Sequence, residues 1–469
     1  MNGDRPYCLV LSGGGAKGVY HIGVRRALKE LGIHIDAYIG NSIGAIISAF
    51  LVQGLDAELE ELGENMTLGS IVDLGSAGIE EADSSPAQEA LKRIEKIYRS
   101  LADKHGLDTT PLRAIIEKSI DEDAIRATGK DLGVTTVNVT DFKATEIFLD
   151  EMEPGSLIDY LMASSAIPGF ALPEIKGKKY VDGGLYDNIP YEMALKRGYR
   201  RIIVVDISGA GMNRRANIEG TETVYIKNSI EMGGVLDFDR KFLEDYNRLG
   251  YLDTMRAFGK LAGYSYFIEP DGELEATFRQ SLALRPPSDS ASTRAPSEAS
   301  RADPRADSLA DLRASFRAAF PERMRHDKRL LMKLLECAAA ALGIDRVREY
   351  GYRELAAAIA EKRDAENARI ERHLAAQTGP EGEARRRRLD ELVFEAVKAR
   401  RFDGSPYYYS RIVDSAAPKR IRAVLERILE GFCPELPAGY LYFDLAEAFM
   451  REAMSETAAA IPDPAKYRE

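Results

Sequence analysis

The stretch Tyr38-Ile39-Gly40-Asn41-Ser42-Ile43-Gly44-Ala45 determines how the first part of this 469-residue chain is interpreted. An apolar strand is predicted before the serine and an apolar helix over 45–52 after it. A Gly-x-Ser-x-Gly sequence between a strand and a helix forms a tight turn, in which the backbones crowd so closely that Gly40 and Gly44 leave no room for a Cβ. Such a turn exposes the Ser42 hydroxyl at a helix N-terminus, which favours developing negative charge. Ser42 is therefore a candidate nucleophile, with an ordinary turn of small residues as the alternative.

A glycine-rich loop follows the first predicted strand, over 7–11, and precedes a helix predicted over 19–31. Its sequence, Gly13-Gly14-Gly15-Ala16-Lys17-Gly18, formally matches the dinucleotide-binding pattern G-x-G-x-x-G. That pattern needs an acidic residue at the end of the second strand, whereas Asp36 precedes that strand. A P-loop fits no better, because the lysine is followed by glycine instead of Ser or Thr.

The third interpretation of this loop is an oxyanion hole. In that case the backbone amides of Gly13, Gly14, Gly15 and Ala16 would point at a carbonyl oxygen bound above Ser42. Two parallel strands would place both loops at the same carboxyl edge of the sheet, where open α/β sheets bind ligands. This position favours the oxyanion hole over a nucleotide loop or a plain structural turn.

A nucleophilic serine needs a general base, and the histidines do not supply one. In α/β-hydrolases the histidine follows the serine and the acid in the chain. The first domain has no histidine after residue 105, and His21, in the first helix, is predicted to pack or to face solvent. The histidines are His21, His34, His105, His326 and His373.

The remaining candidate for the base is Asp182, in Asp182-Gly183-Gly184 after a short apolar strand. The two glycines let the backbone come close to another loop and leave the carboxylate accessible. Burial in a cleft of low dielectric would raise the basicity of the carboxylate, as a general base requires. The alternative is a turn aspartate in an Asp-Gly hairpin.

These motifs, taken in order, resemble those of the patatin-like phospholipases. The glycine loop, the serine turn and the Asp-Gly-Gly turn all match, and so do Ala163-Ser164-Ser165-Ala166-Ile167-Pro168 and Asn188-Ile189-Pro190. The resemblance spans about residues 6–210. It implies a three-layer α/β/α domain with a mainly parallel central sheet.

The resemblance also implies a metal-independent lipid acyl hydrolase that uses a Ser–Asp dyad, without histidine and without a cofactor. Ser42 would be the nucleophile, Asp182 the base, and the amides of Gly13–Ala16 the oxyanion hole. Lys17 would orient the loop or contact a phosphate of the substrate. The glycines that belong to the motifs are Gly18, Gly40, Gly44, Gly183 and Gly184.

Two domains are expected from the length of the chain. The first spans 1–283, with strands and helices alternating and a possible lid over 55–125. A Pro-, Ser-, Ala- and Arg-rich linker over 284–308 is predicted to be disordered. The second domain, over 309–469, is rich in Ala, Leu, Glu and Arg and is predicted to be all-α, with an unknown role.

Composition and charge narrow the possible partners. With 45% hydrophobic and 30% charged residues, the chain has the composition of a soluble globular protein. Most of its net charge of −11 lies before residue 300, which argues against nucleic acid as a ligand. Three widely spaced cysteines and the absence of a visible signal peptide suit the cytoplasm, with peripheral membrane contact possible.

Other functions remain open at this point. The same dyad could transfer the acyl group to an acceptor other than water, or the glycine loop could serve a nucleotide-binding regulatory protein. In the second domain, Arg385–Arg388 is interpreted as a solvated helix face and Tyr407–Tyr409 as a core or partner contact. The lipid head group, the acyl chain, the positional specificity and the oligomeric state are not predicted.

Overall fold

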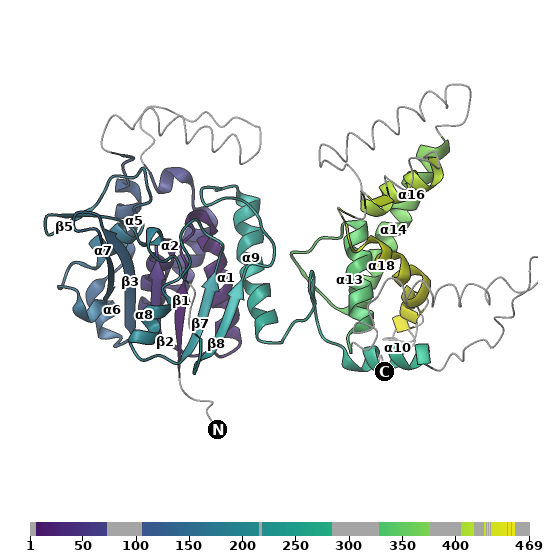
Figure 1. Ribbon diagram of the computed structural model, residues 1–469, viewed down its shortest axis with the longest axis horizontal. Coiled ribbons are helices and arrows are strands. Elements are labelled where there is room, and N and C mark those ends of the chain that lie inside the picture. Colours follow the sequence, from purple (N-terminus) through teal and green to yellow (C-terminus); the bar gives the residue numbers. More distant parts are fainter. Residues whose placement is uncertain are drawn as a thin grey trace, which may run out of the picture. The chain divides into compact units, whose positions relative to one another are not determined.

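A computed structural model of the chain describes residues 6–72, 106–214, 218–283, 328–375, 405–416 and 426–454, with gaps at 428, 430, 432, 448 and 452. The chain divides into two compact units, Met1–Lys260 and Leu261–Glu469 (Figure 1). Each unit has its own buried core, so each is described by itself.

The first unit is built around an eight-stranded sheet with the order β5-β6-β3-β2-β1-β7-β8, in which β4 pairs with β3. The pairs that join β3, β2, β1, β7 and β8 are all parallel, whereas β4, β5 and β6 are antiparallel additions. The strands are β1 (Tyr7–Leu11), β2 (Ile35–Asn41), β3 (Asp131–Asn138), β4 (Lys143–Phe148), β5 (Glu174–Ile175), β6 (Lys178–Asp182), β7 (Arg201–Asp206) and β8 (Glu222–Lys227). The predicted mainly parallel sheet is confirmed.

Helices cover both sides of this sheet (Figure 1), so the unit has three layers. On one side, alternate strand residues such as Val10 and Ile39 pack against Tyr191 and Met193 at the start of α8. The opposite side carries α1 and α2, and α9 packs along α1. The helices are α1 (Val19–Glu30), α2 (Ile43–Gln53), α3 (Asp56–Asn65), α5 (Thr110–Ser119), α6 (Glu122–Ala127), α7 (Leu157–Ser164), α8 (Tyr191–Lys196) and α9 (Arg240–Ala257), with short 3₁₀ turns η1 (Gly15–Gly18), η2 (Leu68–Ser70), η3 (Leu149–Glu151) and η4 (Gly183–Leu185).

The predicted lid region, 55–125, is described in part. Helices α3 and α5 form, and Pro111 lies in the first turn of α5, where a proline costs no hydrogen bond of the helix. Residues 73–105 of the predicted lid lie outside the described residues. Helices α3 and α5 form one wall of a cavity that also contains Ser42.

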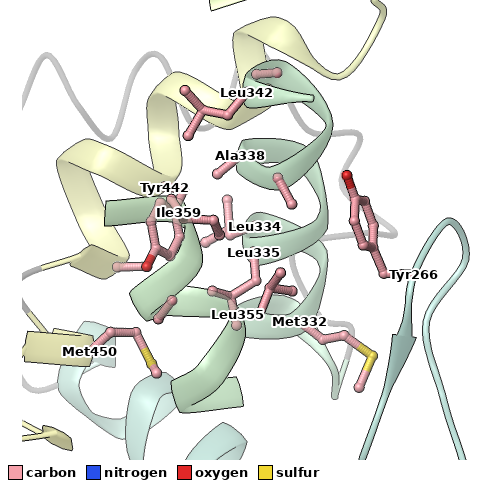
Figure 2. Close-up of a cluster of buried hydrophobic side chains, with 14 of the residues drawn as sticks. Tyr266, Met332, Leu334, Leu335, Ala338, Leu342, Leu355, Ile359, Tyr442 and Met450 are labelled. Carbon is pink, nitrogen blue, oxygen red and sulfur yellow. The ribbon is translucent and has the colours of Figure 1, made fainter. Parts of the chain in front are cut away.

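The described part of the second unit is helical, apart from one short pair of parallel strands. Its apolar core is centred on α13, which is buried on nearly every side and packs against α14 and α18 (Figure 2). The elements are β9 (Phe267–Ile268), α10 (Gly272–Ala283), α13 (Leu330–Leu342), β10 (Glu349–Tyr350), α14 (Tyr352–Ala375), α16 (Pro406–Ala416), α18 (Leu436–Leu441) and the π-helical turn η5 (Tyr442–Ala446). Tyr407 and Tyr408 are buried in this core, as expected.

The boundary between the units differs from the predicted one. Residues 261–283 were assigned to the first domain, but they belong to the second compact unit. The reason is that Tyr266, Ile268 and Phe278 are buried in the core around α13, and β9 pairs with β10. The linker predicted over 284–308 and the arginine run at 385–388 lie outside the described residues.

A buried carboxylate holds the start of α13. The two carboxylate oxygens of Glu275, in α10, accept hydrogen bonds from the amides of Leu331 (3.0 Å) and Met332 (2.8 Å) and from the Tyr352 hydroxyl (2.8 Å). The first amides of a helix have no partner within the helix, so this carboxylate acts as its cap. Within the described part of the chain, every helix is too short or too polar to span a bilayer.

Candidate active site

Strand β3 brings the two halves of the candidate site together. Along one side of β3, β2 runs parallel as far as the pair Asn41–Thr135, and β6 arrives from the opposite direction and ends at the pair Asp182–Thr136. Strand β4 occupies the other side of β3. Ser42, directly after β2, therefore faces Asp182 at the end of β6.

The turn at Ser42 has the strained geometry that its sequence predicts. Ser42 has a φ of 54°, a positive value that non-glycine residues rarely adopt. Its amide donates a hydrogen bond to the Ser164 hydroxyl (2.8 Å), which donates in turn to the Thr135 carbonyl (2.7 Å). Ser164 thus anchors the strained turn to β3, a role that its place in the Ala163–Pro168 segment did not reveal.

The glycines on either side of the serine are required by close backbone approach. A Cβ on Gly40 would lie 2.3 Å from the carbonyl carbon of Gly44, and a Cβ on Gly44 would lie 2.4 Å from the Leu11 carbonyl oxygen. Gly183, beside the candidate base, is equally confined, because its Cβ would lie 2.3 Å from Asn41 Oδ1. Any larger residue at these positions would push the Ser42 turn, β1 and the Asp182 turn apart.

Asp182 is buried and its carboxylate is only partly satisfied by its neighbours. Its Oδ1 accepts hydrogen bonds from the Gly184 amide (2.7 Å) and from Asn41 Nδ2 (3.2 Å). Burial raises the pKa of Asp182 above its ordinary value, and hydrogen bonds from the Ser42 hydroxyl, Gly184 and Asn41 offset part of that rise. The result is a carboxylate of increased basicity in contact with a serine hydroxyl.

Two asparagines connect the base to the glycine loop. Besides Asp182, Asn41 Nδ2 also approaches Asn188 Oδ1 (3.2 Å). Asn188 Nδ2 in turn donates to the Gly13 carbonyl (3.3 Å), and the Gly13 amide donates to the Asn188 carbonyl (3.3 Å). No role was predicted for either asparagine. The only available signal was their position inside the serine turn and after the Asp-Gly-Gly turn.

The glycine loop offers fewer free amides than the four that were predicted. The Gly13 amide donates to Asn188, and the Ala16 amide donates to the Val235 carbonyl (2.8 Å). The amides of Gly14 and Gly15 have no acceptor within the described part of the chain, and both residues line a cavity together with Ser42 and Asp182. The geometry therefore restricts the candidate oxyanion donors to Gly14 and Gly15.

Lys17 is buried and is not among the residues that line the cavities containing Ser42. Its Nζ lies 3.4 Å from the Ser208 carbonyl oxygen and 5.9 Å from the centre of the Tyr246 ring. Burial lowers the pKa of Lys17, and the negative charges of Glu231 and Asp206 act in the opposite direction. Of the two roles predicted for Lys17, this placement suits orienting the loop and does not suit contact with a substrate phosphate.

His21 packs inside the protein, as predicted. Its Nε2 lies 2.9 Å from the Ser12 carbonyl oxygen, so this nitrogen carries the proton and donates it. Complete burial lowers the pKa of His21 to about 4, which leaves the ring neutral at pH 7. None of the histidines in the described ranges lines a cavity with Ser42.

Two cavities meet at Ser42. The first, here called the α2 cavity, has a volume of about 140 Å³ and is lined by apolar side chains of α1, α2, α3 and α5. The second, the Asp182 cavity, has a volume of about 290 Å³ and includes Asp182, Asn188 and the two glycines with free amides. Gly15, Ser42, Ile167 and Leu236 line both.

The sequence of this region matches a known family. Residues 9–195, which contain both Ser42 and Asp182, match the family model described as patatin-like phospholipase. This part of the chain is similar to the patatin-like phospholipases. The resemblance inferred from the motifs is confirmed over these residues, and the second compact unit lies outside the match.

This part of the chain matches segments of much larger proteins. The chain is 28% identical over 210 residues to patatin-like phospholipase domain-containing protein 6 of Mus musculus, which covers 42% of this chain and 13% of that protein. It is 29% identical over 200 residues to lysophospholipase NTE1 of Cryptococcus neoformans, covering 42% of this chain and 11% of that protein. A structural comparison with VipD of Legionella pneumophila gives a TM-score of 0.35 at 15% identity, over 99% of this chain and 93% of that one.

Proposed function

We propose that this protein is a lipid acyl hydrolase that cleaves carboxylic esters with Ser42 as nucleophile and Asp182 as general base. The observation that carries the proposal is that the strained turn at Ser42 meets a buried carboxylate of raised pKa where two cavities join. Both residues lie within the segment that is similar to the patatin-like phospholipases. No histidine of the described part competes for the role of base.

In the first half of the reaction, the ester carbonyl carbon lies next to the Ser42 oxygen. Asp182 accepts the hydroxyl proton while the serine oxygen forms a bond to that carbon. The carbonyl oxygen becomes an oxyanion, which the amides of Gly14 and Gly15 stabilise. When the tetrahedral intermediate collapses, the ester C–O bond breaks, the leaving alcohol takes the proton from Asp182, and the acyl group remains on Ser42.

The second half repeats these steps with water. Asp182, again a carboxylate, accepts a proton from a water molecule as its oxygen attacks the acyl carbon. The same two amides stabilise the second oxyanion. Its collapse breaks the bond to Ser42, returns the proton to the serine oxygen and releases the fatty acid. One carboxylate therefore serves both halves without a histidine.

Apolar side chains are exposed at the entrance to the site. Their exposure supports the proposal that the substrate lies in a lipid surface. Leu185, which lines the Asp182 cavity, is 49% exposed, and Met212 is 58% exposed. The backbone holds the Met212 segment beside the catalytic turn, because the Met212 amide donates to the Gly184 carbonyl (2.9 Å). Such side chains can enter the boundary of a membrane or micelle and align the cavity with it.

The test compares wild type with Ser42→Ala on p-nitrophenyl esters and on phospholipid vesicles, with products identified by mass spectrometry. We expect Ser42→Ala to lose activity by about 10⁴-fold or more, because the nucleophile and its partners act as a unit. Intact-mass analysis of wild type during turnover should reveal an acyl group on Ser42.

Ser48→Ala is the matched control. Ser48 is a buried serine of α2 that donates to the Gly44 carbonyl (2.7 Å) and lines neither cavity. It should retain hydrolysis within a fewfold of wild type. Full activity in Ser42→Ala, measured on protein shown to be folded by circular dichroism, would refute the proposed function.

A further inference from the structure

The α2 cavity follows one face of the helix that begins beside the nucleophile. Ser42, Ile43, Ile46, Ile47 and Phe50 all line it, and their spacing places them on the same side of α2. From Ser42 to Phe50 the helix advances by about 12 Å. The cavity is therefore elongated and begins at the attacking oxygen.

The surroundings of the α2 cavity are those of a hydrocarbon binding site. The wall opposite α2 is formed by residues such as Leu59 of α3 and Ile116 of α5, and α1 adds Ile22. Among the described residues, none of those that line it is charged. A hydrocarbon chain is the group that such a space binds, because each methylene transferred from water is stabilised and no polar group is left unpaired.

The Asp182 cavity differs in chemistry as well as in position. Asp182 and Asn188 line it, and neither residue lines the α2 cavity. Under the proposed mechanism Asp182 must deliver its proton to the oxygen of the leaving alcohol. That oxygen must therefore lie on the Asp182 side of the ester, and the acyl chain must extend the other way.

We propose that the two cavities divide the substrate: the fatty acyl chain of the ester lies along α2, and the alcohol part occupies the Asp182 cavity. This inference rests on the proposed function and adds to it the direction of the substrate. Phe50 lies farthest from Ser42 along the helix among the α2 residues of the cavity and is only 1% exposed. Its ring closes the far end and sets the longest chain that fits.

The experiment measures kcat/KM for p-nitrophenyl esters with acyl chains of increasing length, on the full chain. For wild type, kcat/KM should rise by up to about fourfold per methylene while the chain fills the α2 cavity, and then level off or fall. Phe50→Ala should move this maximum to longer chains. Because loss of a buried aromatic ring destabilises the fold, the milder Phe50→Leu is measured beside it.

A second variant acts in the opposite direction. Ile46→Phe places a larger side chain in the middle of the cavity, so the maximum should move to shorter chains. Phe278→Leu, a change at a fully buried phenylalanine of the second unit, is the matched control and should keep the wild-type chain-length profile. Calorimetric binding of dodecanoate to Ser42→Ala gives a readout without turnover, and Ile46→Phe in that background should weaken it.

The outcomes distinguish a failure of this inference from a failure of the proposed function. If Ser42→Ala abolishes ester hydrolysis but the Phe50 and Ile46 variants keep the wild-type profile, the protein is a hydrolase and the assignment of the acyl chain to the α2 cavity is wrong. If Ser42→Ala hydrolyses the esters as wild type does, the proposed function itself is wrong. A profile that moves in opposite directions in the two variants supports both.

Discussion

Asp182 in the first unit and Glu275 in the second are both buried carboxylates that accept hydrogen bonds from backbone amides. Burial is the largest cause of a raised pKa at each of them. They differ in what the second oxygen contacts. Both oxygens of Glu275 accept hydrogen bonds from fixed groups, whereas both of the fixed donors to Asp182 end on Oδ1.

This difference separates a structural carboxylate from a catalytic candidate. Glu275 lines none of the cavities described above, and its three donors satisfy it where it lies. Asp182 lines a cavity and contacts the hydroxyl of a strained serine. Burial and a raised pKa are therefore shared features, and the accessible oxygen beside a nucleophile is the distinguishing one.

The comparison is tested most strongly by changing each carboxylate to its carboxamide. In Asp182→Asn, Oδ1 can keep its two donors, but the residue can no longer accept the Ser42 proton. We expect kcat to fall by about 10⁴-fold, measured with a p-nitrophenyl ester at pH 7. Unchanged kcat would place the general base elsewhere.

The same variant should not lose stability at neutral pH. A carboxyl group whose pKa is raised by folding contributes stability below its unfolded-state pKa, and this contribution disappears as the pH rises through the folded-state pKa. At pH 7 the charged Asp182 therefore costs stability, and Asp182→Asn removes that cost. Its thermal midpoint at pH 7 should equal or exceed that of wild type.

Glu275→Gln should give the opposite result. Whichever way the new amide is oriented, its NH₂ group meets a backbone amide that needs an acceptor, so the start of α13 loses its cap. We expect a loss of about 1–3 kcal/mol in unfolding free energy, measured by urea denaturation followed by fluorescence. The value of kcat should stay as in wild type at temperatures where the variant is folded.

Glu244→Gln is the control for the loss of unfolding free energy in Glu275→Gln. Glu244 forms an exposed ion pair with Arg240 on α9, in which the two side chains are 57% and 85% exposed. The change should cost less than about 0.5 kcal/mol, as exposed pairs do. If Glu275→Gln costs no more than this control, Glu275 is not the cap of α13.

The smallest expected effect concerns Asn41, which donates to the catalytic candidate and not to the structural carboxylate. In Asn41→Ala the Asp182 anion loses a donor, so its pKa rises further. The fall of kcat/KM at acidic pH, where Asp182 becomes protonated, should then begin about one pH unit higher than in wild type. Asn138→Ala, at a β3 residue whose side chain bonds to Asp141 and Thr140, is the control with an unshifted profile.

Much of the first unit could be predicted because its information is local. The strand and helix around Ser42 follow from an apolar pattern interrupted by glycines, and the crowding at Gly40 and Gly44 follows from the turn type. Asp182 could be proposed only by elimination and resemblance. Its place beside Ser42 depends on the antiparallel pairing of β6 with β3, and no local pattern specifies that pairing.

Other features depend on contacts between distant segments. The Gly13 amide donates to Asn188 and the Ala16 amide donates to Val235, which leaves two candidate oxyanion donors in the glycine loop. Nothing near Gly13 or Ala16 in the chain indicates either bond. The unit boundary was misplaced for the same reason. Residues 261–283 have the alternation of strand and helix seen in the first unit, but their apolar side chains are buried around α13.

The meeting of β2 and β6 along the same side of β3 also determines when the proposed activity can arise during synthesis. The nucleophile leaves the ribosome about 140 residues before the base, as the sequence separation of 141 between Asn41 and Asp182 indicates. A nascent chain that ends within β4 already contains the Ser42 turn, but it has no carboxylate to accept the proton. Contacts between such distant segments form late, because a long loop must close first. Under the proposed function, a chain that ends before β6 is therefore unable to hydrolyse an ester, and hydrolysis can begin only once Asp182 has joined β3.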